Sequence, residues 1–202
     1  MLQILLNYLS VSKILMHMCI GLYWLCMLQL SATLVNQNVL SLRTGGRVAT
    51  AIEPIINPNN LKVEGFYCDD RFEKKKLILL TQDIRDRVRN GFVINDHEVL
   101  ADPEELVRLQ SVLKLQFALI GKPVVTVNKK RLGKINDYAV DDTALYVQKI
   151  YVGQSIVKSL TGGNLSIDRS QIIEITDRKI VVQDPLKGVK STVPVGAPSI
   201  AG

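Results

Sequence analysis

Histidine, the commonest general base, offers little in this chain. The sequence has two histidines among its 202 residues. His17 lies in an apolar N-terminal stretch, and His97 lies in the polar run Asn95–Glu98, where we expect an exposed turn. A general base must lie within hydrogen-bonding reach of its partners, and no Ser-His-Asp or Cys-His arrangement can be assembled around either residue. The sequence therefore predicts no catalytic residues, and we expect the protein not to be an enzyme.

Two aspartate pairs are the next candidates, for a metal ion or for paired-carboxylate chemistry. Asp69–Asp70 and Asp141–Asp142 each follow an expected strand. Neither pair lies in an EF-hand loop or beside a histidine ligand. Aspartate commonly caps turns through its own side chain, so we interpret both pairs as turn residues and expect no metal site.

Glycine turns and cysteines give no sign of a cofactor. The runs Thr44–Gly46 and Thr161–Gly163 are not followed by Lys-Ser or Lys-Thr, and no G-x-G-x-x-G motif occurs, so we interpret both as hairpin turns. The 3 cysteines form neither a C-x-x-C pair nor a zinc-type set with histidine. We expect no cofactor, and the odd number of thiols fits a reducing cytoplasm.

Arginine and lysine form two clusters that could bind phosphates or an acidic protein. The sequence has 25 Lys and Arg residues against 19 Asp and Glu residues, a net charge of +6. Arginines alternate through Asp83–Arg89, where Asp86 offsets part of their charge, and a second cluster lies at an expected hairpin tip. Neither cluster has an interleaved aromatic residue for base stacking, so a solvated loop is the simpler interpretation. The candidate interaction residues are Arg85, Arg87, Arg89, Lys129, Lys130 and Arg131.

Short strands separated by turn signals predict an all-β fold after the N-terminal stretch, and three blocks of sequence occur twice in the same order. The separation between copies falls from 87 residues (46 to 133) to 84 (61 to 145) and then 81 (96 to 177), which we interpret as longer loops in the first copy. The matched blocks are Gly46–Ile52 with Gly133–Val140, Leu61–Tyr67 with Leu145–Tyr151, and Ile94–Ala101 with Ile175–Val182.

The duplication makes specific expectations about packing. A shared shift of the apolar phase predicts a β-bulge at Gly65 and at Lys149, and bulges help a sheet to curl into a barrel. Gly46 and Gly133 should occupy matching turns, and Asp83–Arg89 should be an insertion that the second copy lacks. The residues predicted to be buried are Leu61, Val63, Phe66, Val99, Leu145, Val147, Ile150 and Ile180.

A short helix is expected between the copies. Asp102 suits the N-cap and Pro103 the first helical position. Leu106, Leu109 and Leu113 would then share one face, which we interpret as core packing against a barrel rather than as a partner-binding groove.

The second copy carries a resemblance to a known family. Ile120–Thr126 and Leu132–Asp141 resemble the opening of a PRC-barrel domain, and Gln171–Val182 resembles its closing strands. The resemblance implies two tandem small PRC-type β-barrels, at residues 35–101 and 118–184, joined by a short helix at 102–117. It also implies docking onto a larger assembly, since PRC-barrels occur in the photosynthetic reaction centre H subunit and in a ribosome maturation factor. We expect the Pro- and Gly-rich residues 185–202 to form a disordered tail.

The N-terminal residues 1–30 form an apolar leader with three interpretations. Ile14–Leu30 is near the length of a membrane-spanning helix, and Lys13 before it also permits a secretory signal. In the third interpretation translation begins at Met27 and residues 1–26 come from an over-extended reading frame. An anchor followed by Arg43 and Arg47, or a start at Met27, would place the barrels in the cytoplasm.

Three functional hypotheses follow. The first is a non-enzymatic adaptor or docking module for a protein partner, located in the cytoplasm. The second is an RNA- or ribosome-associated factor that uses the two basic clusters. The third is a single-pass membrane protein, anchored through Ile14–Leu30, with cytoplasmic barrels.

Overall fold

β-strands dominate the computed structural model, which describes residues 28–153 and 165–184. The mostly β fold class expected from the sequence is confirmed. The strands are β1 (Leu28–Leu30), β2 (Gln37–Ser41), β3 (Arg47–Asn57), β4 (Lys62–Asp70), β5 (Lys76–Leu80), β6 (Ile84–Val88), β7 (Gly91–Ile94), β8 (Pro123–Thr126), β9 (Arg131–Asp141), β10 (Val147–Gly153), β11 (Leu165–Asp168), β12 (Ile172–Ile175) and β13 (Ile180–Val182). The helical elements are α2 (Gln110–Leu115) and the 3-10 turns η1 (Ser31–Thr33), η2 (Thr81–Asp83), η3 (His97–Val99), η4 (Val107–Leu109) and η6 (Arg169–Gln171).

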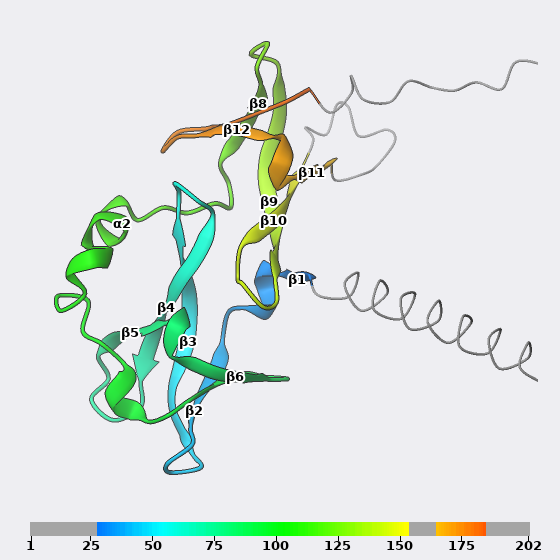
Figure 1. Ribbon diagram of the computed structural model, residues 1–202. Coiled ribbons are helices and arrows are strands. Elements are labelled where there is room, and N and C mark those ends of the chain that lie inside the picture. The colour runs from blue at the N-terminus through cyan, green and yellow to red at the C-terminus, as the bar shows by residue number, and fades with distance from the viewer. Residues whose placement is uncertain (1–27, 154–164, 185–202) are drawn as a thin grey trace, which may run out of the picture.

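The strands form two sheets (Figure 1), and the order of the strands is equivalent in both. One sheet runs β5-β4-β3-β2-β7-β6 and the other β11-β10-β9-β8-β13-β12, with β1 added to β9. A parallel pair joins β2 to β7, and the equivalent parallel pair joins β8 to β13. The duplication read from the sequence therefore extends to strand topology. Among the described strands the outermost two of each path do not pair with each other, so the sheets are open rather than closed into barrels.

The central hairpins of the two sheets match residue by residue. Ile56 pairs with Val63 and Val140 pairs with Val147, a constant separation of 84 residues (56 to 140). The register of both hairpins shifts just before Gly65 and just before Lys149, so the predicted bulges are confirmed. Each bulge adds twist to its strand pair and helps the sheet to curve around the core.

The expected equivalence of Gly46 and Gly133 is wrong. Val39 pairs with Ala49, and Val124 pairs with Gly133, so the equivalent of Gly133 is Ala49 within the strand. Gly133 has no side chain because a Cβ there would overlap the carbonyl of Gly153. The hairpin turns are matched instead by Gly45 and Lys129, whose left-handed φ values are +68° and +62°.

The predicted equivalence of Ile94–Ala101 with Ile175–Val182 is also wrong. Ile84 pairs with Ile94, and Ile172 pairs with Val182, so Ile94 corresponds to Val182 and not to Ile175. β6 is consequently the equivalent of β12, and the arginine-rich segment is a shared strand rather than an insertion. The two Ile-x-Asp runs look alike because each ends a strand with a polar turn, which is a feature common to many strand ends.

A single hydrophobic core serves both sheets. Its buried cluster includes Phe66 and Phe92 from the first sheet and Ile150 and Ile180 from the second. The residues predicted to be buried are buried except Val99, which is half-buried. Val99 ends η3, and the turn directs the following Leu100 inward at 8% exposure.

The sheets meet through a reciprocal pair of backbone hydrogen bonds. The N–H of Val63 donates to the carbonyl of Leu145, and the N–H of Val147 donates to the carbonyl of Leu61, each over 2.9 Å. Leu61 and Leu145 share a left-handed φ of +55° and are both buried. Equivalent residues exchange equivalent bonds, as at a two-fold interface between identical subunits.

The segment that precedes each copy crosses to the other copy. β1 and η1 precede β2 but contact β9, on which β1 pairs antiparallel. α2 precedes β8 but packs against β3, where Val112 lies in one small cluster with Ile55. The segment that leads into the first copy therefore contacts the second copy, and the segment that leads into the second copy contacts the first.

The linking helix begins later than expected. Asp102 accepts a hydrogen bond from the N–H of Glu104 in a turn, and the helix starts only at Gln110. Pro103 lies in the same turn, in which the N–H of Glu105 also donates to the carbonyl of Asp102. The leucine stripe does pack onto the first sheet, with Leu106, Leu109 and Leu113 against Ile55 and Ile78.

The terminal predictions lie mostly outside the described residues. No helix among the described residues is long and apolar enough to cross a membrane. Of the apolar leader and the proposed Ile14–Leu30 anchor, only Leu28–Leu30 are described, and they form β1. The proposed start at Met27, the turn at Thr161–Gly163 and the tail at 185–202 fall outside the described residues.

Candidate functional site

The arginine cluster is only partly available to a partner. Arg87 donates to the carboxylate Oδ1 of Asp142 over 2.6 Å and to Oε1 of Gln29 over 2.6 Å. Burial lowers the pKa of the Arg87 guanidinium, and the Asp142 carboxylate opposes that shift. Arg85 donates to the side chain of Asn95 but is exposed, and Arg89 is exposed. Arg87 therefore joins the two copies, and a ligand would have to compete for it with Asp142.

The lysine cluster lies at the other end of the molecule. Lys129, Lys130 and Arg131 are exposed at the tip of the β8–β9 hairpin, where the N–H of Lys129 donates to the carbonyl of Thr126. In Figure 1 this tip is at the top, and β6 with its arginines is in the lower half. The structure does not bring the two basic clusters together into one surface.

Asp70 and Asp141 each accept hydrogen bonds from the backbone of the following turn, and Asp70 and Asp142 also contact a basic side chain. Asp141 accepts hydrogen bonds from the N–H groups of Thr143 and Ala144, as expected of a turn aspartate. Asp142 is bound to Arg87. Asp70 is buried, and its side chain accepts from the N–H of Glu73 and contacts Nε2 of His97 over 2.7 Å.

His97 and Asp70 form the one histidine–carboxylate contact among the described residues. Burial raises the pKa of Asp70, but the hydrogen bonds from the backbone of Glu73 and from His97 outweigh it and lower the pKa overall. Phe72 stacks edge-on against the His97 ring at 5.2 Å between centroids. The sequence predicted an exposed turn for His97, and we find a half-buried residue that ties η3 to the end of β4. Within the described part of the chain, no group of three or more His, Cys, Asp or Glu residues could hold a metal ion.

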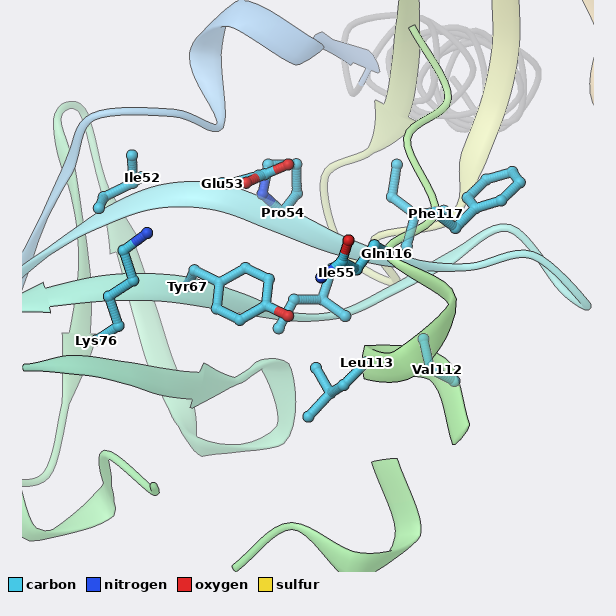
Figure 2. A pocket seen from close by; sticks show the side chains of 11 residues that line it. Ile52, Glu53, Pro54, Ile55, Tyr67, Lys76, Val112, Leu113, Gln116 and Phe117 are labelled. Carbon is cyan, nitrogen blue, oxygen red and sulfur yellow. The ribbon is translucent and has the colours of Figure 1, made fainter. Parts of the chain in front are cut away.

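A groove lies along β3 where the linker returns toward the second sheet. It has a volume of about 400 Å³, and Figure 2 shows the side chains that line it. Tyr67, Ile55 and Leu113 face the space between β3–β4 and α2 (Figure 2). Glu53 and Lys76 also line it, and burial together with the Glu53 charge raises the pKa of Tyr67. Apolar side chains line the groove together with the polar groups of Glu53, Tyr67, Lys76 and Gln116, a combination found in binding sites.

A second hollow of about 360 Å³ adjoins the first, on the side of the second sheet. Both are lined by Glu53, Pro54, Ile56 and Phe117, so they flank the same stretch of β3. Tyr138 of β9 also lines the second hollow, and burial followed by the charges of Asp137 and Glu53 raises its pKa. We call this pair of hollows the β3 groove. It consists of two adjoining hollows lined mainly by apolar residues, and Glu53, to which no described residue donates a hydrogen bond, lines both.

Pro54 lies within β3, where it pairs with Phe66 of β4 but has no partner in β2, because β2 pairs with β3 only as far as Ala51. In the second copy the same position is Tyr138, whose N–H donates to Oδ1 of Asp137 rather than along the sheet. A proline there removes a donor that the sheet does not use. A proline within a β-branched run was the one signal in the sequence that could have marked the β3 groove.

Comparison with known proteins does not assign the chain to a family. No protein-family model matches the chain, and no curated protein matches it.

Proposed function

We propose that the protein is a docking module of the PRC-barrel type that binds a protein partner in the β3 groove. The observation that carries this proposal is the β3 groove itself, which lies between two duplicated sheets and has Glu53 in the lining of both of its hollows. Apolar side chains together with a few charged and polar groups, here Glu53 and Lys76 among them, suit an extended or helical protein segment.

The duplicated topology supports the PRC-type assignment. Each copy has a six-strand path in which a parallel pair joins a four-strand meander to a final hairpin, and a 3-10 turn joins the fourth strand to the fifth. The opening and closing strands that resemble the family, Ile120–Thr126 and Gln171–Val182, contain β8, η6, β12 and β13. Such small curved sheets serve as rigid scaffolds, and their function lies in the grooves and loops they carry.

Electrostatics favour a protein partner over a nucleic acid. Arg87 is occupied by Asp142 and Gln29, and the lysine cluster lies far from it. Nucleic-acid binding draws on a concentrated basic surface, and the described residues do not assemble one. A protein partner is therefore favoured over RNA.

The test is recovery of a partner from native cells with two charge-reversal variants. Glu53→Lys changes the centre of the β3 groove, and Glu98→Lys makes the same change on the exposed η3 turn as a matched control. We expect a stoichiometric protein partner with the unmodified protein and with Glu98→Lys, and at least a tenfold loss with Glu53→Lys. Equal recovery with all three proteins would place the docking site elsewhere. Recovery of small-molecule turnover without any partner would contradict the docking function.

A further inference from the structure

An unpaired strand edge lies in the β3 groove. β2 pairs with β3 only as far as Ala51, whereas β4 pairs with it as far as Asn57. Within the described residues, Ile55–Asn57 therefore have a strand neighbour on the β4 side alone. A row of free backbone donors and acceptors at such an edge is a template for another strand.

The other copy shows this same edge occupied. Ala139–Asp141 are the equivalents of Ile55–Asn57, and β1 pairs with them antiparallel. The register is Leu28 with Asp141, Gln29 with Val140 and Leu30 with Ala139. One half of the molecule thus contains a bound strand that has no counterpart among the described residues of the other half.

The residue after β1 shows how the occupant is fixed. Ser31 follows the strand directly, and its hydroxyl donates to Oδ1 of Asp137 over 2.5 Å while its N–H donates to the same atom over 3.3 Å. The equivalent of Asp137 in the first copy is Glu53, because Asp137 pairs with Tyr151 as Glu53 pairs with Tyr67. No described residue donates a hydrogen bond or forms an ion pair to the exposed Glu53 carboxylate.

The equivalent of β1 in sequence is helical and stands away from the edge. α2 takes this place, and Val112 contacts Ile55 from the outer face of the sheet. The cavity of about 400 Å³ remains between α2 and β3, with Val112, Leu113 and Phe117 along its wall. The difference between the copies leaves an edge, an acid and apolar walls in one place.

We infer that Ile55–Asn57 accept an extended segment of a partner protein, which adds antiparallel to β3 as β1 adds to β9. The segment has the pattern apolar, any residue, apolar, serine or threonine. Its backbone pairs with the free edge, its apolar side chains lie against Val112 and Leu113, and its hydroxyl donates to Glu53. In strand addition, main-chain hydrogen bonds supply affinity and alternate side chains supply specificity. This inference rests on the proposed docking function and names the class of partner.

The probe is a fluorescently labelled peptide of sequence Leu-Gln-Leu-Ser-Ala-Thr-Leu, identical to residues 28–34. Its binding to the full-length protein is measured by anisotropy, and its site is mapped by backbone amide shifts. We expect saturable binding with shifts at Ile55–Asn57. Replacing the peptide serine by alanine should weaken binding about tenfold or more, because a hydrogen bond to a charged group is lost.

Two protein variants complete the test. Glu53→Ala should weaken the serine peptide to a similar extent and make it insensitive to the serine-to-alanine change, because the acceptor is removed, while Glu98→Ala should leave both peptides unaffected. Absence of saturable binding, shifts confined to Ala139–Asp141, or equal loss from the two peptides with Glu53→Ala would overturn the inference. If Glu53→Lys abolishes partner recovery but the peptide does not bind, the docking proposal is supported and strand addition is contradicted. If the peptide binds as expected while partner recovery ignores Glu53→Lys, the strand site stands and the docking proposal falls.

Discussion

At the scale of single residues, the two carboxylates that matter most are held in opposite ways. Asp70 is buried and has its lone pairs filled by backbone N–H groups and by His97. Glu53 is exposed and no described residue donates to it. A carboxylate whose oxygens accept hydrogen bonds within the protein contributes to stability, and a carboxylate without such bonds in a groove is available to a ligand.

The first prediction concerns acid stability through Asp70. Its pKa is lowered from 3.8 in the folded state, so its charged form contributes stability above that value and the contribution is lost as pH falls through the lower folded pKa. Asp70→Asn should reduce the free energy of unfolding at neutral pH by roughly 1.5–3 kcal/mol and flatten its pH dependence between about pH 5 and pH 1.

The measurement is urea unfolding across that pH range, with Asp69→Asn as the control. Asp69 is the exposed neighbour in the same strand and should give a curve close to that of the unmodified protein. An acid limb of unchanged slope in Asp70→Asn would show that other carboxylates govern acid unfolding.

At the scale of elements, the duplication makes one copy a control for the other. Asp137 accepts from the N–H and the hydroxyl of Ser31 and from the N–H of Tyr138. Its equivalent Glu53 faces a proline nitrogen, which has no N–H to donate. The acid at this position therefore holds the segment that follows β1 in the second copy, and it has no such contact with a described residue in the first copy.

The second prediction uses this pair directly. Asp137→Ala should lower the free energy of unfolding by about 1–3 kcal/mol, because it leaves the donors of Ser31 and Tyr138 without an acceptor. Glu53→Ala should change it by roughly 0.5 kcal/mol or less, as for an exposed site. Both values come from urea titrations, and similar losses from the two variants would mean that Glu53 also has a structural role.

The sequence was a good guide to these elements wherever burial set the pattern. The strands around Val63 and Val147 were matched correctly because both alternate about the same bulge and bury the same apolar side chains. It failed at Gly46 and at Ile175, where the match relied on turn residues that many strand ends share. It could not place the β3 groove, since Glu53, Gln116 and Phe117 are brought together only by the path of the linker.

At the scale of the whole molecule, the two copies share one core although their sheets are separate. Phe66 and Ile150 belong to the same buried cluster, and both are fully inaccessible to solvent. Arg87 adds a polar link, from β6 of one sheet to the turn after β9 of the other. We expect the described strands to unfold as one cooperative unit.

The third prediction tests that cooperativity. Ile150→Ala should destabilise the protein by about 2–5 kcal/mol through the cavity it leaves. If the core is shared, hydrogen exchange should accelerate equally for the amides of β3 and of β9, although the change lies in the second copy alone. Acceleration restricted to β8–β13 would show that the two sheets open independently.

The crossing of β1 and α2 has a consequence for the covalent chain. Because each copy is clasped by the segment leading into its neighbour, and Leu61 and Leu145 bond across the junction, the peptide between residues 102 and 107 is not what keeps the halves together. A chain cut by a protease at that linker should migrate as two fragments in denaturing gels and elute undivided, at the volume of the intact protein, from a sizing column.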